Sequence, residues 1–363
     1  MRFGRTPEQH AFSGALDDLL GGADVAAASR AWAEGDHSSG LKLWQRLAEL
    51  GVTGLLVPEE RGGVGATSVD LAVALERLGY HGVPGPWIES VAVVPVLLAG
   101  TPDSDVLQRV ASGEAVISVA CAGRALDADI CERTYAVSDR GGLTVSDTSR
   151  PPADGGSPLV EPGERRRAGV ETSTVASATV HRAVVRGGRT SVDPTRRLFD
   201  VTQGVEIAPA DPTALDLGTL ACSAQLLGAG LRLLDDTVAY VKQRTQFGRP
   251  IGEFQAVKHL LTDVRVALDF AAPLVHNAAV EVEAGTPTAG RAVSAAKVAA
   301  GDAAYLASRT ALQAHGAIGY TREFDVSLWI LKVRALVGAW GTPAEHRARI
   351  LAQLTGDGMV EAR

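Results

Sequence analysis

Two short segments in the last third of the sequence carry residue types that suit binding of a phosphate-bearing ligand. They are Arg244, Gln246 and Phe247 in RTQFG, and Gln313, Gly316 and Ala317 in QAHGAIG. An arginine pairs with pyrophosphate through its planar fork, an aromatic ring offers a stacking face, and a glycine loop exposes backbone donors. Each segment also has a simpler interpretation as a helix end, with Phe247 packed in the core and Gln313 in solvent.

A single acidic residue, Glu345, lies among small and apolar residues in the segment LVGAWGTPAEHRAR. Its carboxylate could act as a general base. However, the preceding TPAE pattern has the form of a capping box, with Thr342 at the N-cap, proline at the first helical position and Glu345 at the third. A capping box turns the carboxylate onto its own helix end, so we favour the capping interpretation. His346, the next residue, is predicted to lie at the surface.

Four helices are predicted between residue 211 and the end of the chain. The first begins at Asp211, an N-cap followed by proline, and the second begins near Phe254. The third ends at Gly316, and the last begins near Thr342. Their apolar faces predict an antiparallel four-helix bundle over residues 211–363. The two segments described above would then meet in one cleft.

The first two thirds of the chain divide into a helical region and a β region. Residues 1–111 contain amphipathic helical patterns in SGLKLWQRLAELG and SVDLAVALERLG, and an apolar helix in ESVAVVPVLLAG. Residues 112–210 contain short Val- and Thr-rich runs, among them EAVISVACA, TYAVS, GGLTVS and TVHRAVVRGG, which predict a small β domain. The polar, turn-rich segment 149–169 is predicted to be an exposed loop.

The composition argues against several classes of function. The net charge is −7 and no basic run is interleaved with aromatic residues, which excludes nucleic acid as a partner. The three cysteines form no C-x-x-C pair, so we expect neither a disulfide framework nor a zinc or other metal site. No membrane-spanning run or signal segment is evident, and we expect a cytoplasmic protein.

At this point the sequence resembles the acyl-CoA dehydrogenase family. The motifs that carry the resemblance are VPEERGGVGAT and LERLG in the first region, DPTRR at 193–197, then RTQFGRPIGEFQAVKH and QAHGAIGYT. The resemblance covers the whole chain. It implies an N-terminal all-α domain, a small central β domain and a C-terminal four-helix bundle. It also implies FAD bound at a subunit interface, oxidation of an acyl-CoA thioester to the 2-enoyl-CoA, and electron transfer to an electron-transferring flavoprotein.

The resemblance assigns roles to both segments. In the family, the R-x-x-F-G and Q-x-x-G-G loops reach the ADP half of the FAD bound by the neighbouring subunit. The matching cofactor-binding residues here are Arg244, Gln246, Phe247, Gln313, Gly316 and Ala317. The last of these is alanine where the family has its second glycine, and its methyl group is expected to be tolerated.

The same comparison leaves the chain without a catalytic base. The family usually supplies a glutamate in a Y-E-G-T stretch to remove the α proton, and Trp340 stands at that place. In other members the base lies near the start of the first bundle helix, where this chain has Gly218 and Thr219. Asp216 is close in sequence but would point about 200° away on a helix. We therefore predict no catalytic residue on this chain.

The β region also departs from the family pattern. Catalytic members carry a T-E-P-x-x-G-S-D stretch that holds the flavin ring, and this chain has VACAGRALDADICERTYAVS instead. Its flavin-ring site is therefore predicted to be degenerate, while its ADP-binding loops are intact. In the family these two half-sites come from different subunits.

These features predict one subunit of a heteromeric (α2β2) acyl-CoA dehydrogenase, paired with a homologous catalytic subunit. Such pairs act on bulky substrates such as steroid side-chain CoA thioesters. Two alternatives remain open. One is a self-sufficient homotetramer whose base has moved to Glu345 or Asp216, and the other is a non-catalytic scaffold or acyl-CoA-binding homologue without flavin.

Overall fold

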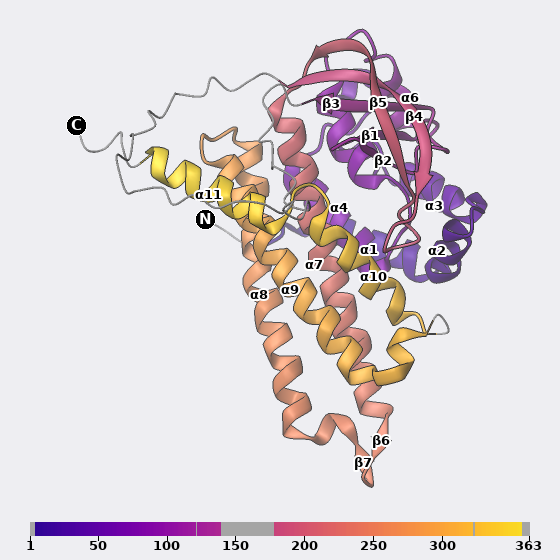
Figure 1. Cartoon of the computed structure of the whole chain (residues 1–363), viewed down its shortest axis with the longest axis vertical. Coiled ribbons are helices and arrows are strands. Elements are labelled where there is room, and N and C mark those ends of the chain that lie inside the picture. Colours follow the sequence, from indigo (N-terminus) through magenta and orange to yellow (C-terminus); the bar gives the residue numbers. More distant parts are fainter. Residues whose placement is uncertain (1–3, 121, 139–177, 322–323, 358–363) are drawn as a thin grey trace, which may run out of the picture.

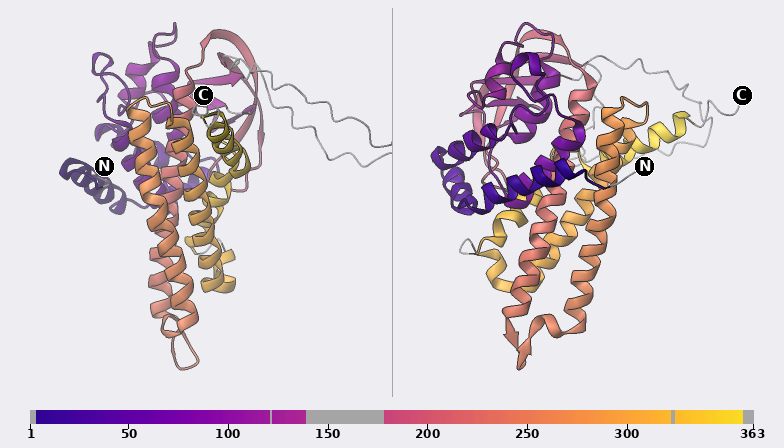
Figure 2. Two further views of the ribbon diagram at one scale, coloured as in Figure 1. Left: turned by 90° about the vertical axis from the view of Figure 1, so that its left-hand side faces the viewer. Right: turned by 180° about the vertical axis from the view of Figure 1, so that it is seen from behind.

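The computed structural model describes residues 4–120, 122–138, 178–321 and 324–357. Figure 1 shows a sheet packed beside short helices at one end of the molecule, and long helices that extend from it to the other end. Figure 2 shows the same arrangement from two other sides. This is the predicted acyl-CoA dehydrogenase-like order of helical region, sheet and bundle. The domain boundaries at residues 111 and 210 stay a prediction.

The first region is helical, as predicted. Its elements are α1 (Pro7–Gly21), α2 (Val25–Ala33), α3 (Ser38–Glu49), α4 (Ser68–His81), a π-helical turn (Ile88–Val93), α5 (Val94–Leu97) and α6 (Val106–Ala111), with a 3-10 turn at Glu59–Arg61. The predicted apolar helix at ESVAVVPVLLAG is therefore two short pieces, with Pro95 in the first turn of α5. Proline has no N–H to donate, which breaks the regular α pattern of hydrogen bonds there.

The second region forms a five-stranded sheet. Its strands are β1 (Ile117–Ala120), β2 (Arg124–Leu126), β3 (Arg133–Ser138), β4 (Thr179–Arg189) and β5 (Leu198–Pro209), in the order β1-β3-β4-β5-β2. Strands β1 and β3 run parallel, and the other neighbours are antiparallel. The predicted strand at GGLTVS and the predicted loop at 149–169 lie outside the described residues.

The third region contains one helix more than the sequence predicted. Its elements are α7 (Pro212–Gln243), a hairpin of β6 (Thr245–Gln246) and β7 (Arg249–Pro250), a 3-10 turn (Ile251–Glu253), α8 (Gln255–Glu283), α9 (Ala289–His315), a second 3-10 turn (Gly316–Tyr320), α10 (Val326–Gly338) and α11 (Pro343–Asp357). Helix α10 packs against both α7 and α9 and completes the bundle. The prediction that the last helix begins near Thr342 is confirmed, because α11 begins at Pro343. The prediction of four helices was wrong, because α10 lies before it. The sequence of α10 is apolar almost all round, so it shows no clear helical period.

Helix α7 forms the centre of the bundle. It is long and apolar enough to cross a membrane by length and composition, which the sequence reading did not anticipate. However, 89% of its most apolar window is buried inside the molecule, and it packs against α4, α8, α9 and α10. This burial is the pattern of a core helix.

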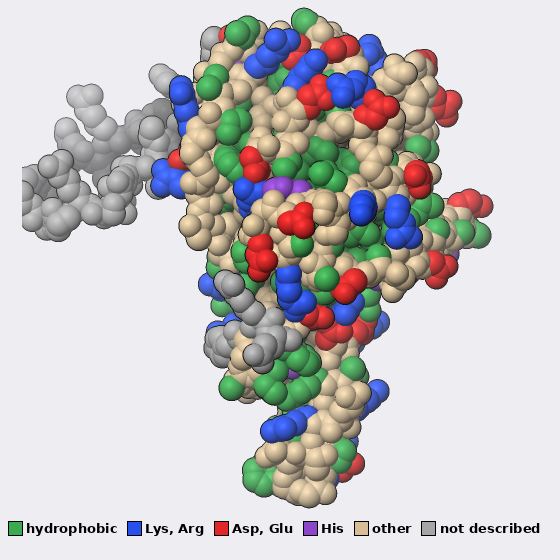
Figure 3. Space-filling view, turned by 90° about the vertical axis from the view of Figure 1, so that its right-hand side faces the viewer, with side chains coloured by type: hydrophobic (Ala, Val, Ile, Leu, Met, Phe, Trp, Pro, Cys, Tyr) green, Lys and Arg blue, Asp and Glu red, His purple; other side chains and the backbone are tan. Residues whose placement is uncertain are grey.

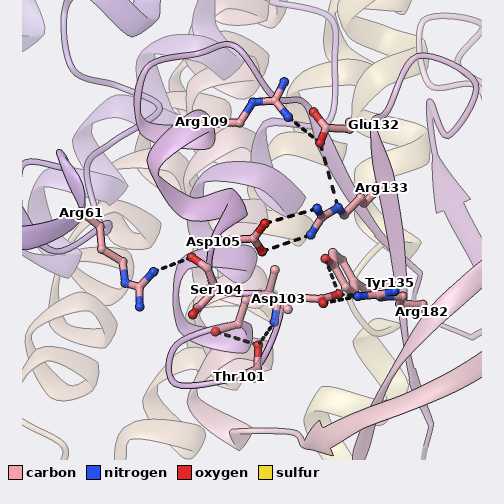
Figure 4. Close-up of polar contacts among 11 residues, drawn as sticks. Arg61, Thr101, Asp103, Ser104, Asp105, Arg109, Glu132, Arg133, Tyr135 and Arg182 are labelled. Atoms are coloured by element: carbon pink, nitrogen blue, oxygen red, sulfur yellow. Dashed lines mark hydrogen bonds and ion pairs between the residues drawn. The ribbon is translucent and has the colours of Figure 1, made fainter.

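A polar cluster joins the first region to the sheet (Figure 4). The buried carboxylate of Asp103 accepts hydrogen bonds from the Tyr135 hydroxyl at 3.0 Å and from Arg182 Nε at 2.8 Å. These two partners come from β3 and β4. The hydrogen bonds from the Arg182 guanidinium are the largest cause that lowers the pKa of Asp103. The sheet is therefore fixed to the helical region by a charge-assisted contact.

A second buried carboxyl, Asp127, makes a similar join near β2. Its Oδ1 accepts from Trp32 Nε1 of α2 at 3.2 Å and from the Arg197 backbone N–H at 3.3 Å. Its Oδ2 has no hydrogen-bond partner. Burial is the main cause that raises the pKa of Asp127 from 3.8 to about 7. The residue also has a φ of 48°, a conformation that asparagine adopts more readily than most residues.

Replacing Asp127 should therefore remove one source of pH-dependent stability. A carboxyl with a raised pKa in the folded state contributes stability that is fully present below pH 3.8 and is lost as the pH rises through about 7. Asp127→Asn does not titrate, so the fall in unfolding free energy between about pH 4 and 7 should become shallower. Urea unfolding at a series of pH values measures this. A wild-type slope in Asp127→Asn would contradict the assignment.

Candidate functional site

The two predicted binding segments lie at the same end of the bundle. Helices α7 and α9 run in the same direction, and a groove of about 450 Å³ between their ends is lined by Tyr240, Gln243, Arg244, Ile318 and Phe324, among others. Arg244 comes from the end of α7, and Ile318 belongs to the turn after α9. Figure 1 shows the hairpin at the tip of this end, and Figure 3 shows hydrophobic and basic side chains on its surface. The structure therefore brings Arg244 and the glycine loop to one groove.

The hairpin after α7 presents an aromatic side chain to solvent. Strands β6 and β7 are joined by the two residues Phe247 and Gly248, whose φ values are 53° and 80°. A two-residue turn with both φ values positive is the type I′ turn that suits the twist of a hairpin. The Phe247 side chain is 92% exposed. The interpretation that Phe247 packs in the core of this chain was therefore wrong, because the hairpin projects beyond the bundle.

The other candidates at this end are also open to solvent. Gln246, Gln313, Gly316 and Ala317 are all exposed. Gly316 ends α9 with a φ of 62°, and a Cβ built there would meet nothing within 4 Å. Arg244 is exposed, and no ion pair of its side chain is found among the residues that the structure describes. The Phe247 ring meets Phe254 edge-on, with ring centroids 6.2 Å apart, and most of its surface stays open to solvent. This end of the molecule therefore presents a cation, an aromatic ring and a glycine loop to solvent.

A second cavity of about 530 Å³ lies at the centre of the molecule. The sheet, the π-helical turn and the segment from α10 to α11 surround it. Its wall includes Trp340, Glu345, Glu89 and Arg196. The cavity therefore contains Trp340, the position at which the sequence analysis found no catalytic base.

Trp340 lies directly over Gly218. A Cβ built on Gly218 would come within 2.5 Å of Trp340 Cζ3 and 2.9 Å of Val93 Cγ2. Thus Trp340 and Gly218, the two positions at which the family places its base, face each other here. Neither offers a carboxylate, because Trp340 carries an indole and Gly218 has no side chain. Thr219 instead donates its hydroxyl to the Leu215 carbonyl at 3.0 Å.

Two buried side chains hold the loop that carries Trp340. Lys297 is 1% exposed, and its Nζ donates to the carbonyls of Leu336, Val337 and Gly341 at 3.2, 2.9 and 3.3 Å. His346 Nε2 donates to the Trp340 carbonyl at 2.9 Å. Because this histidine is 6% exposed, the prediction that it lies at the surface was wrong. Burial is the main cause that lowers the pKa of His346, which favours the neutral ring.

Glu345 forms the predicted capping box. Its Oε2 accepts from the Thr342 backbone N–H at 2.7 Å and from the Thr342 hydroxyl at 2.9 Å, and the Glu345 N–H donates back to that hydroxyl at 3.3 Å. The hydrogen bond from the Thr342 backbone N–H is the largest cause that lowers the pKa of Glu345. A carboxylate with a lowered pKa is a weak base. Asp216 is also engaged, in a bidentate pair with Arg349 at 2.5 and 3.0 Å.

Sequence reasoning missed two residues in the cavity wall. Glu89 is 3% exposed, and its Oε2 has no hydrogen-bond partner. Arg196 is 9% exposed. A signal for Glu89 was present in the sequence, because it is the one acid in the apolar run WIESVAVVPVLLAG. Arg196 lies in the DPTRR motif, which was used for the resemblance alone.

Comparison with known proteins agrees with this architecture. Residues 6–114 match the model of the acyl-CoA dehydrogenase N-terminal domain, and residues 209–355 match that of the C-terminal domain. The chain is 32% identical over 333 residues to the acyl-CoA dehydrogenase IpdE2 of Mycobacterium tuberculosis, covering 90% of this chain and 91% of the relative. The IpdE2 of Mycolicibacterium smegmatis is 30% identical over 330 residues, with 90% and 92% covered.

The chain belongs to the acyl-CoA dehydrogenase family.

Several solved structures share its fold. A variant of the Tcur3481-Tcur3483 steroid ACAD matches with a TM-score of 0.77 at 19% identity, covering 97% of this chain and 99% of that one. The ChsE4-ChsE5 complex of Mycobacterium tuberculosis matches with a TM-score of 0.77 at 19% identity, with 98% and 99% covered. The FAD complex of PigA matches with a TM-score of 0.73 at 16% identity, with 98% and 99% covered. At these identities the likeness shows the fold.

The Glu345 capping box leads to a prediction about catalysis and stability. Glu345→Gln should leave activity of the assembled enzyme and its melting temperature nearly unchanged, because glutamine completes a capping box but cannot act as a base. Thr342→Ala, which removes the N-cap, should cost about 0.5–2 kcal/mol of stability. Activity assays and thermal melts of the three proteins measure both effects. A loss of activity by orders of magnitude in a well-folded Glu345→Gln enzyme would make Glu345 the base.

The contact between Gly218 and Trp340 leads to a further prediction about stability. Gly218→Ala should destabilise the chain by about 1–3 kcal/mol, because the new methyl group would overlap the indole. Adding Trp340→Ala should recover part of the loss, which a double-mutant cycle detects by thermal or urea unfolding. Gly301→Ala in α9 is the matched control, because its Cβ would meet nothing within 4 Å and helix propensity favours alanine. Wild-type stability of Gly218→Ala would rule out close packing at this site.

Proposed function

We propose that this chain is one subunit of a heteromeric FAD-dependent acyl-CoA dehydrogenase. In this proposal the chain contacts the ADP end of an FAD whose flavin ring is bound by a homologous partner, and the partner also supplies the base. The observation that carries the proposal is the packing of Trp340 over Gly218, which leaves both base positions of the family without a carboxylate. The similarity to the steroid ACAD and ChsE4-ChsE5 structures supports a heteromeric assembly.

The residues at the bundle end fit the ADP half of FAD. Arg244 would pair with the pyrophosphate, Phe247 would offer a stacking face, and the backbone at Gly316 and Ala317 would approach closely. Gln246 and Gln313 would supply amide hydrogen bonds. All six are exposed and point outward from their own chain. A cofactor contacted in this way would be held mainly by another subunit, as the proposal requires.

The central cavity does not supply the groups that dehydrogenation needs. When bound, FAD accepts the hydride from the β carbon, and a carboxylate must remove the α proton. On this chain Glu345 is turned onto Thr342 and Asp216 is paired with Arg349. We therefore assign the proton transfer to the partner. An acyl-CoA thioester of a steroid side chain would be the substrate, and an electron-transferring flavoprotein would accept the electrons.

A specific observation favours a second candidate function, a self-sufficient dehydrogenase with Glu89 as its base. Glu89 has an unpartnered carboxyl oxygen and lies in the wall of the central cavity. Burial is the main cause that raises the pKa of Glu89, which favours the protonated acid over the basic form. Acyl-CoA oxidation by the isolated chain, abolished by Glu89→Gln, would support this second function and reject the first.

The role of Arg244 is testable through FAD retention. Arg244→Ala should lower the FAD affinity of the assembled complex about tenfold or more, because a charge-assisted contact contributes about 1.5–3 kcal/mol. The melting temperature of the flavin-free chain should stay unchanged, because Arg244 has no ion pair within the described part of the chain. FAD absorbance after gel filtration measures the retained cofactor.

The control for this experiment is Arg109→Ala. Arg109 is also exposed, but it pairs with Glu132 at 2.7 Å, and its helix α6 lies at the opposite end of the molecule from the β6–β7 hairpin (Figure 1). Its replacement should leave the FAD content at the wild-type level. Equal FAD occupancy in Arg244→Ala and wild-type complexes would remove Arg244 from the cofactor site.

A further inference from the structure

A buried histidine connects the two segments that the proposed function assigns to the ADP end of FAD. His315 is the last residue of α9 and is 4% exposed. It directly precedes Gly316, where the glycine loop begins. Its ring stacks on the ring of Tyr240 in α7, with centroids 4.2 Å apart and an angle of 23° between the planes. The backbone N–H of Arg244 in turn donates to the Tyr240 carbonyl at 2.9 Å. One ring pair therefore joins the turn that carries Arg244 to the start of the glycine loop.

The ring pair lies beneath the groove at the end of the bundle. Tyr240 and Phe324 line this groove, whereas the buried His315 does not. The Phe324 ring meets both other rings, with its centroid 5.3 Å from that of His315 and 6.0 Å from that of Tyr240. His315 therefore supports the groove wall from inside without forming its surface. A ligand in the groove would contact Tyr240 and would depend on His315 only indirectly.

A single hydrogen bond orients the ring of His315. Because a carbonyl only accepts, Nδ1 is the donor to the Ala311 carbonyl at 2.8 Å, and in the neutral ring Nε2 carries no proton. Nε2 is buried and has no hydrogen-bond partner among the described residues. Burial is the main cause that lowers the pKa of His315, which favours the neutral ring. An apolar ring would leave no polar atom unpaired here, so phenylalanine is expected to fit without loss of stability.

The glycine loop needs such a support because its first residue has no side chain. Gly316 has a φ of 62°, and a Cβ built there would meet nothing within 4 Å. Glycine is the residue with the greatest backbone freedom, so little in Gly316 itself fixes the path of the loop. The stack of His315 on Tyr240 supplies an anchor directly before it. A loop that is already ordered loses less conformational entropy when a ligand binds, which increases the affinity.

We propose that His315 is a positioning residue, which acts through Tyr240 to hold the glycine loop and Arg244 in the relative arrangement that binds the ADP end of FAD. This inference rests on the proposed function, since it takes this end of the bundle to contact FAD. It gives a role to a residue that does not line the groove, and it makes Tyr240 the residue through which that role is exerted.

The test compares two apolar replacements of His315 in the complex with the homologous catalytic partner. His315→Leu removes the flat ring, so FAD affinity should fall about three- to tenfold, the range that an aromatic pair contributes. His315→Phe keeps a flat ring for the stack and should bind FAD within about twofold of the wild type. Titration of the flavin-depleted complexes with FAD, followed by flavin fluorescence, measures the dissociation constants. Thermal melts of the flavin-free chains show whether each variant is folded.

A double-mutant cycle separates this indirect role from a direct contact. If His315 acts through Tyr240, His315→Leu should cause no further loss of FAD affinity in a Tyr240→Leu background. The control is Trp44→Leu, which breaks a different stack, that of Trp44 on Trp87 in the first region, with ring centroids 4.0 Å apart. This variant should lower the melting temperature but leave the FAD affinity of the folded complex unchanged.

The outcomes distinguish this inference from the proposed function. Wild-type FAD affinity in His315→Leu, or equal losses in His315→Leu and His315→Phe, would show that the stack does not position the site. A full additional loss in the Tyr240→Leu background would remove Tyr240 as the intermediary. If Arg244→Ala also keeps wild-type FAD affinity, the proposed function fails as well. Weak binding by Arg244→Ala beside normal binding by His315→Leu rejects the role of His315 alone.

Discussion

The Nζ of Lys297 donates to three carbonyl groups around the end of α10, and all three of its hydrogen-bonding protons are thereby used inside the protein. A buried ammonium is tolerable only when it is satisfied in this way. The loop that follows α10 must therefore keep the path that places Trp340 over Gly218. His346 fixes the same loop from the side of α11 through the Trp340 carbonyl. The character of the central cavity follows from these contacts, because they decide which side chain occupies the position of the family's base.

The central cavity and the end of the bundle contrast in how they use their polar groups. In the central cavity, Glu345 and Asp216 are engaged by Thr342 and Arg349, and the bulky indole covers a glycine. At the end of the bundle, Arg244 and Phe247 are exposed, and the Phe247 ring contacts only Phe254 edge-on among the ring pairs of the described residues. A chain that acts alone has little use for such a projecting hairpin. A chain that contacts a cofactor on its neighbour needs it. This contrast is the physical basis for the division of labour that we propose.

Much of the fold was predictable from the sequence because its signals are local. The N-cap at Asp211, the capping box at Thr342 and the alternating strand at TVHRAVVRGG each depend on neighbouring residues, and each is present. Helix α10 was missed because most of its partly exposed positions are also apolar, which obscures the helical spacing of its buried residues Val326, Trp329, Val333 and Leu336. The burial of His346 was predicted wrongly, and the interpretation that packs Phe247 in the core was wrong too, since both depend on which elements pack together in three dimensions. The other interpretation, in which Phe247 contacts FAD, stays a prediction. Glu89 and Arg196 line the same cavity although about a hundred positions separate them in the sequence, and no sequence pattern relates them.

The central claim is that the FAD sites of the complex are divided between two kinds of chain. The most direct test is the ratio of FAD to protein in the complex purified with its homologous catalytic partner, from flavin absorbance and quantitative amino-acid analysis. If this chain contributes only ADP-end contacts, the complex should contain about one FAD per heterodimer, and the chain purified alone should contain almost none. One FAD for every chain, or a flavin-loaded and active single chain, would contradict the account.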